Sequence, residues 1–202
     1  MWYPNMPSTQ GIIASSKYQY QIGDTGPAGG IIFITPSTSG NSTGLWFEAA
    51  PTTWYSGTQD APDIYYWRCS GTNVTNGATA IGTGKTNTEA FMTNGCGVSA
   101  TDSGLYIAST LVLNGYDDWF IPSEDELNEM YINKTALGIS SSGIRIYWSS
   151  TDTVFDISNP YRTARNQAFA GAVPGFKGDS SKNFKGGTYY WRPCRSFAGK
   201  KI

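Results

Sequence analysis

Apolar and aromatic side chains recur along this chain in short runs bounded by Gly, Pro, Ser and Asn, a pattern that predicts strands joined by turns and loops. The clearest run is Ile-Ile-Phe-Ile-Thr at residues 31–35, which follows a turn cluster rich in Gly. The same pattern predicts further strands at residues 45–51, 144–150, 166–170 and 189–197.

A helix is predicted where an aromatic turn runs into a capping signal, within residues 115–131. Ser123 and Glu126 have the S-x-x-E spacing of a capping box, and the acidic residues at 124–126 suit the first turn of a helix. Leu127, Met130 and Tyr131 then share one face. Acid/base chemistry is the alternative role for these carboxylates, but capping accounts for them better. We expect residues 115–131 to organise the fold.

Two shorter helices are also predicted. Thr86 and Glu89 form a second capping box for a helix through Phe91, which Gly95 would end. Another helix is expected from Asp102 or Ser103 through Val112. Short helices among short strands, with long irregular segments, indicate an α+β domain. We place it at residues 20–202, after an extended arm at residues 1–19 whose Trp2, Tyr3 and Met6 are candidates for attachment to a partner.

The composition narrows the functional classes. Among the 202 residues, 14% are charged, 14% are aromatic and 24 are Gly, as in surfaces that bind through rigid rings and small polar groups. There is no histidine, which removes His-based catalytic triads and the commonest metal ligand, so we expect no enzyme, cofactor or metal site. We also expect no membrane insertion and no classical secretion signal.

Charge is distributed unevenly. Residues 1–133 contain 3 basic and 12 acidic side chains, whereas residues 134–202 contain 11 basic and 3 acidic ones. Either the two parts neutralise each other within one fold, or the second part forms a basic face for an anionic glycan or an acidic protein. Nucleic acid is not an expected partner, because the domain as a whole is not basic.

The three cysteines lack C-x-x-C spacing, so no zinc site is predicted. Cys69 and Cys96 lie in loop-like segments and either form a disulfide, which would indicate an extracellular or virion-surface setting, or stay reduced. Cys194 lies in a strand-like run and is expected to be a buried thiol.

Six ordered motifs between about residues 20 and 198 resemble the Lcl C-terminal domain family of bacterial collagen-like adhesins and phage tail fibre tips. They are Ile-Gly-Asp-Thr-Gly-Pro-Ala-Gly-Gly-Ile-Ile-Phe (22–33), Leu-Trp-Phe-Glu-Ala-Ala-Pro (45–51), Ala-Ile-Gly-Thr-Gly-Lys-Thr-Asn (80–87), Asp-Trp-Phe-Ile-Pro-Ser-Glu-Asp-Glu-Leu-Asn (118–128), Tyr-Trp-Ser-Ser-Thr (147–151) and Arg-Pro-Cys-Arg-Ser-Phe (192–197). The resemblance implies a C-type-lectin-like fold, with two or three short helices, small antiparallel sheets and long loops. It also implies adhesion to glycans or host surfaces, often as a homotrimer.

Within these motifs we expect Trp119, Trp148 and Phe197 to be core, and Arg192 and Arg195 to tie strands to loop carbonyls or acids. C-type lectins that bind sugar through calcium use Glu-Pro-Asn or Gln-Pro-Asp and Trp-Asn-Asp triplets. This chain has Ser-Asn-Pro at 158–160 and Trp-Ser-Ser at 148–150 instead, so calcium-mediated sugar binding is not predicted.

These observations favour a phage virion structural protein, made in the host cytoplasm and displayed on the virion surface of a tail fibre or capsid. Its domain would bind a host receptor or glycan, and its arm would bind other virion proteins. A capsid decoration (cement) protein without host recognition and a secreted bacterial adhesin are the alternatives. Candidate ligand contacts are the loop aromatics and three basic residues, because rings stack on sugars and guanidinium groups bind acids: Trp54, Tyr55, Tyr65, Tyr66, Trp67, Arg162, Arg165 and Lys177.

Overall fold

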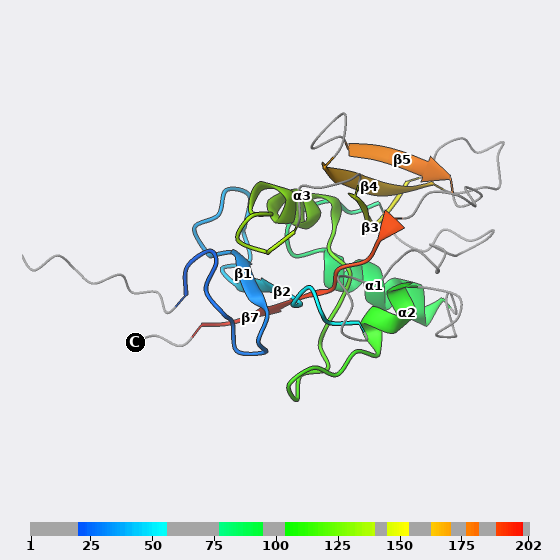
Figure 1. Cartoon of the computed structure of the whole chain (residues 1–202). Coiled ribbons are helices and arrows are strands. Elements are labelled where there is room, and N and C mark those ends of the chain that lie inside the picture. Colours follow the sequence, from blue (N-terminus) through cyan, green and yellow to red (C-terminus); the bar gives the residue numbers. More distant parts are fainter. Residues whose placement is uncertain are drawn as a thin grey trace, which may run out of the picture.

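The computed structural model describes residues 20–55, 77–94, 104–139, 145–153, 163–170, 177–181 and 189–199. The predictions for the arm with Trp2, Tyr3 and Met6, for the Cys69–Cys96 pair, and for Tyr65, Tyr66, Trp67 and Arg162 lie outside these residues and stay predictions. What is described is a mixed α+β fold, as expected, with two small sheets and three short helices (Figure 1).

One sheet has three antiparallel strands in the order β1-β2-β7. Strands β1 (Ile31–Ile34) and β2 (Trp46–Ala49) confirm the first two predicted strands. Strand β7 (Cys194–Phe197) pairs with β2, so the first and last strands described along the chain lie on either side of β2. The sheet thereby joins the two ends of the domain (Figure 1).

The other sheet has the order β5-β4-β3-β6. Strands β3 (Arg145–Thr153) and β4 (Thr163–Ala170) confirm two predicted strands and extend beyond the predicted bounds. Strand β5 (Lys177–Ser181) was not predicted, because its polar sequence carries no alternation; it lies at the sheet edge, paired with β4.

The prediction of one continuous strand at residues 189–197 was wrong. The structure divides it into β6 (Tyr189–Tyr190), which is parallel to β3, and β7 in the other sheet. The division falls next to Pro193, which has no N–H to donate to a ladder. The Pro193 carbonyl instead accepts from the Ala50 N–H at 2.9 Å, just beyond the end of β2.

The helix α3 (Glu124–Ile132) confirms the predicted capping box: the Ser123 hydroxyl accepts from the Glu126 N–H, and the Glu126 carboxylate accepts from the Ser123 N–H. Leu127 and Met130 are buried, and Tyr131 packs half-buried against the same cluster. The segment before α3 is buried as expected, and Phe120 exchanges two backbone hydrogen bonds of 2.8 Å with Cys194 of β7. Residues 115–131 thus do connect the two sheets, since the Ser150 N–H of β3 donates to the Pro122 carbonyl at 2.8 Å.

The other two helices differ from their predicted bounds. Helix α1 (Gly84–Thr93) has Thr83 as its N-cap, so the predicted start at Thr86 was wrong. Helix α2 (Gly104–Ser109) ends before Val112. The chain then makes a tight turn at residues 113–116, whose ends exchange hydrogen bonds of 2.9 and 3.0 Å.

Two apolar clusters hold these elements together. One lies where α3 meets both sheets and contains Phe33, Phe47, Phe120, Tyr147 and Phe169 among others. The second joins α1, α2 and β3 around aromatic residues that include the expected Trp119 and Trp148, together with Phe91 and Trp191. Phe197, also expected to be core, is half-buried and stacks on Trp46 at 6.4 Å.

Candidate functional site

The position of α1 is fixed by a carboxylate that belongs to α3. Glu126 is fully buried; its Oε1 accepts from the backbone N–H groups of Gly82 at 2.7 Å and Gly84 at 3.4 Å, and its Oε2 accepts from Ser123 at 2.7 Å. This carboxylate therefore caps α3 and also supplies the acceptors that the start of α1 needs. Because Glu126 and the start of α1 are far apart in the sequence, no local sequence pattern predicts this second role of Glu126.

Burial and hydrogen bonding act on Glu126 in opposite directions. Burial raises the pKa of its carboxyl to about 7, while the hydrogen bonds from Ser123, Gly82 and Gly84 oppose that rise. The site has no room for a larger residue at position 84: a Cβ on Gly84 would collide with Glu126 Oε2 and lie 2.8 Å from the Ser123 nitrogen. Residues 82–84 and the start of α3 are thus packed as one unit.

A second buried charge network links the three-stranded sheet to the segment before α3. Arg195 of β7 binds both carboxylate oxygens of Asp118, through Nε at 2.6 Å and Nη2 at 2.9 Å, and its Nη1 binds Glu48 of β2 at 2.7 Å. Glu48 also accepts from the N–H groups of Ala28 and Gly30. Burial lowers the pKa of Arg195, but the hydrogen bonds to Asp118 and Glu48 outweigh burial, and the net direction is upward.

Arg192 has the other expected tying role. Its Nε donates to the Ala50 carbonyl at 2.7 Å and its Nη2 to the Leu137 carbonyl at 3.2 Å. The prediction that Arg192 and Arg195 tie strands to carbonyls and acids is therefore confirmed.

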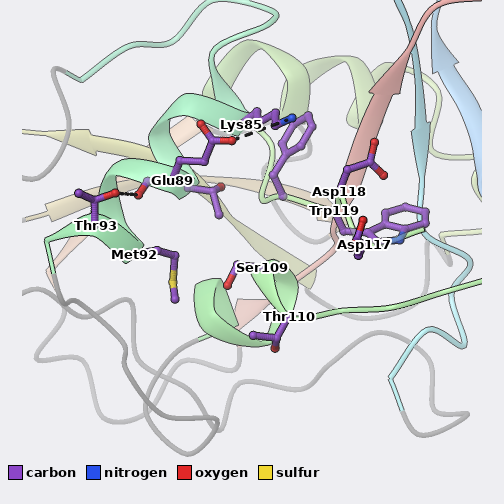
Figure 2. Close-up of a pocket in the computed structure, with 11 residues that line it drawn as sticks. Lys85, Glu89, Met92, Thr93, Ser109, Thr110, Asp117, Asp118 and Trp119 are labelled. Atoms are coloured by element: carbon purple, nitrogen blue, oxygen red, sulfur yellow. Dashed lines mark hydrogen bonds and ion pairs between the residues drawn. The ribbon is translucent and has the colours of Figure 1, made fainter. Parts of the chain in front are cut away.

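On this frame lies a pocket of about 540 Å³, between one face of α1, the end of α2 and residues 117–120 (Figure 2). The volume is within the usual range for small-molecule sites, about 300–1,000 Å³. The described residues that line it are Lys85, Thr88, Glu89, Met92, Thr93, Ser109, Thr110, Asp117, Asp118, Trp119 and Phe120.

The pocket has an apolar base and a charged rim. Trp119 and Phe120 are buried in the base. At the rim, Lys85 and Glu89 form an ion pair of 4.0 Å along α1, with side chains 52% and 63% exposed. Asp117 is exposed, and the Asp118 side chain is 36% exposed although both of its carboxylate oxygens bind Arg195. Such a site can hold a polar ligand by hydrogen bonds while an apolar face rests on the base.

The hydroxyl groups of the lining already use their protons. The Thr93 hydroxyl donates to the Glu89 carbonyl at 2.9 Å, and the hydroxyls of Ser109 and Thr110 both donate to the Tyr106 carbonyl at 2.9 Å. A hydroxyl has one proton and two lone pairs, so these three can offer a ligand only acceptor sites. With the carboxylates, they make the lining rich in acceptors.

Four of the predicted contact residues lie in the described part of the chain, and none of these four is among the described residues that line this pocket. Trp54 is 7% exposed and belongs to the aromatic cluster under α1 and α2, so the expectation that its ring faces a ligand is corrected: a large ring gains more from burial. Tyr55 lies half-buried beside it, with ring centroids 5.6 Å apart. Lys177 lies in β5, opposite Gln167, and Arg165 lies 3.5 Å from Glu124 of α3.

Several basic residues of the last third are engaged within the fold. Arg192 and Arg195 are buried, Arg165 is paired with Glu124, and the Arg145 guanidinium lies over the Tyr190 ring at 5.1 Å. Within the described part of the chain, this supports mutual neutralisation of the acidic and basic parts rather than a basic face.

Sequence reasoning missed the pocket residues on α1 and α2. The only signal was the spacing by four of Lys85, Glu89 and Thr93, which share one face of the helix observed at Gly84–Thr93 but extend beyond the helix that was predicted. That spacing does not reveal which neighbouring element the stripe faces.

Other site types were sought over the same residues. The described ranges contain no cluster of three or more His, Cys, Asp or Glu placed to hold a metal ion. Among the described helices, none combines the length and apolar character needed to span a membrane. Cys194 is buried and free, as expected. No family model, no curated protein and no solved structure matches the chain.

Proposed function

We propose that this chain is a virion structural protein whose domain, C-type-lectin-like in fold, binds a host surface receptor or glycan without catalysing a reaction. The α+β architecture supports the fold assignment, because short helices flank two small sheets as the sequence resemblance implies (Figure 1). The resemblance further supports display at the virion surface, attachment to other virion proteins through residues 1–19, and a homotrimer.

The observation that carries the binding role is the acceptor-rich pocket between α1 and α2 (Figure 2). Sugars present hydroxyl donors on a ring with apolar faces, and this lining presents acceptors around an apolar base. The two buried networks, around Glu126 and around Arg195, hold its walls in place before a ligand arrives. A site that is already ordered loses less entropy on binding.

A binding role is favoured over catalysis by what the carboxylates contact. Asp118 is bound at both oxygens by Arg195, and Glu126 is enclosed by backbone amides away from the pocket. No histidine exists in the sequence to take their place in proton transfer. Measurable glycan cleavage that falls on Asp117→Asn would reverse this assignment.

The proposal is tested by measuring binding of the full chain to host cells and to a glycan array. Thr110→Trp places a large ring at the exposed wall of the pocket and should abolish saturable binding. Thr53→Trp is the matched control, because Thr53 is also exposed but lies outside the lining. Equal binding by both variants would exclude the pocket as the adhesion site.

The same preparation separates adhesion from capsid decoration. A decoration protein would bind isolated virus particles through residues 1–19 and show no binding to host cells or glycans. Deleting residues 1–19 should then lower particle stability, whereas for the adhesion role it should lower host adsorption while the free domain still binds its glycan.

A further inference from the structure

We infer that the pocket selects a sugar carrying an unsubstituted, protonated amino group, and that it discriminates against acidic sugars. This inference rests on the proposed adhesion function and adds the ligand class. It differs from one alternative drawn from the sequence, in which a basic face of the last third binds an anionic glycan.

The hydrogen-bonding capacity of the lining is the first argument. Glu89, Asp117 and Asp118 have acceptors only, and the hydroxyls of Thr93, Ser109 and Thr110 have their protons committed to backbone carbonyls. The Thr88 hydroxyl is also occupied, because it donates to the Gly84 carbonyl at 2.9 Å and accepts from the Ile121 N–H at 3.1 Å. Lys85 is the one side chain of the described lining with N–H donors directed to solvent.

An ammonium group matches that capacity better than other groups on sugars. It has three N–H donors and no acceptor, so each of its hydrogen bonds can be made to this lining. A hydroxyl also needs a donor to use its lone pairs, and an N-acetyl group brings a carbonyl for which Lys85 is the one side-chain donor among the described lining residues. Carboxylate or sulfate groups have acceptors alone and would find almost no donors here.

Charge gives the second, independent argument. Among the described residues of the lining, the carboxylates of Glu89, Asp117 and Asp118 outnumber the one cation, Lys85. Arg195 lies behind Asp118, but it is shared with the buried Glu48 and does not reverse the balance. The last turn of α1, which supplies Met92 and Thr93 to the pocket, contains no basic residue, so the negative end of the helix dipole adds to the same sign.

The test is calorimetric titration of the full chain with three oligosaccharides of equal length: glucosamine, N-acetylglucosamine and a uronic acid. The glucosamine oligomer should bind tightest and the uronic acid oligomer weakest. Raising the salt concentration should weaken binding of glucosamine more than that of its N-acetylated form. Equal or tighter binding of the N-acetylated or acidic oligomer would overturn the inference.

Two substitutions of opposite sign sharpen this test. Asp117→Asn should weaken glucosamine binding about two- to fivefold, and Lys85→Gln should strengthen it by a similar factor, as expected for single exposed charges near a ligand charge. Asp24→Asn removes an exposed carboxylate outside the pocket and should change nothing. Unchanged near-ultraviolet circular dichroism would show that each variant is folded. If Asp117→Asn and Lys85→Gln shift affinity in the same direction, the charge argument is wrong.

The outcomes also separate this inference from the proposed function. Host-cell binding that is lost on Thr110→Trp, combined with no preference for the free amine, would overturn the ligand class and leave adhesion standing. Absence of binding to host cells and to all three oligosaccharides would overturn both.

Discussion

Replacing Glu126 with Gln should change how the stability of the protein depends on pH. In the folded protein burial raises the pKa of Glu126 to about 7, from an ordinary value of 4.5. Between these values the folded state keeps a proton that the unfolded chain releases, so the free energy of unfolding falls as pH rises through this window and levels off above it. A span of about 2.5 pH units, at about 1.36 kcal/mol each, corresponds to roughly 3 kcal/mol.

Urea unfolding of wild type and Glu126→Gln between pH 4.5 and 8.5 measures this effect. The absence of histidine removes the side chain that ordinarily titrates in that window, and the difference between the two proteins cancels groups they share. Relative to the variant, the wild type should lose roughly 3 kcal/mol between the ends of the range. The variant also carries a constant penalty, because a Gln amide N–H₂ must face a backbone donor from Ser123 or Gly82.

Glu124→Gln is the matched control, since it makes the same change in a half-buried side chain of the same turn. A pH trend that both variants share would not be assigned to Glu126. The reasoning is refuted if the Glu126 difference is flat to within about 0.5 kcal/mol, or if it has the opposite sign. A flat difference would mean that the three backbone hydrogen bonds offset burial, and the opposite sign would mean that they outweigh it.

Three further predictions concern the frame. Arg195→Met should lower the free energy of unfolding in urea by about 3–5 kcal/mol, because Glu48 is left as a buried charge without its cation, and a loss below about 1 kcal/mol would contradict this. Gly84→Ala should lower the free energy of unfolding in the same assay by more than about 1 kcal/mol, because its Cβ collides with Glu126. An unchanged urea midpoint would show that Glu126 and its neighbours can move to make room for the methyl group. Cys194 should resist alkylation until the chain unfolds, because burial, with a smaller effect from Glu126, raises the pKa of its thiol. Peptide mass spectrometry that detects alkylated Cys194 in the folded protein would contradict this prediction.

The features that the sequence predicted correctly are those that depend on residues close together in the chain. The start of α3 was predictable because Ser123 and Glu126 are three residues apart and cap each other. Strands β1 and β2 were predictable from apolar runs bounded by turn residues. The tying role of Arg192 and Arg195 could be expected because a long forked guanidinium amid aromatic residues needs acceptors.

Tertiary partners decided what the sequence pattern could not predict. Helix α1 starts at Gly84 because the Gly84 N–H donates to Glu126, which lies 42 residues later in the sequence. The residues around Thr86 contain no pattern that predicts this contact. The division between β6 and β7 depends on which sheet each segment joins. The pocket depends on how α1, α2 and residues 117–120 meet, so its polar residues could not be distinguished from an ordinary solvated helix face.

The fork of Arg195 has a consequence for how this protein can evolve. Asp118 lines the pocket and also completes the buried network with Glu48, so a substitution at Asp118 changes the lining of the proposed ligand site and removes an ion pair of the fold. Lys85, Glu89 and Asp117 are exposed and do not belong to that buried network. Under the proposed adhesion role, a change of ligand should therefore accumulate substitutions at those three positions and leave Asp118 unchanged, so that ligand preference can change without loss of stability.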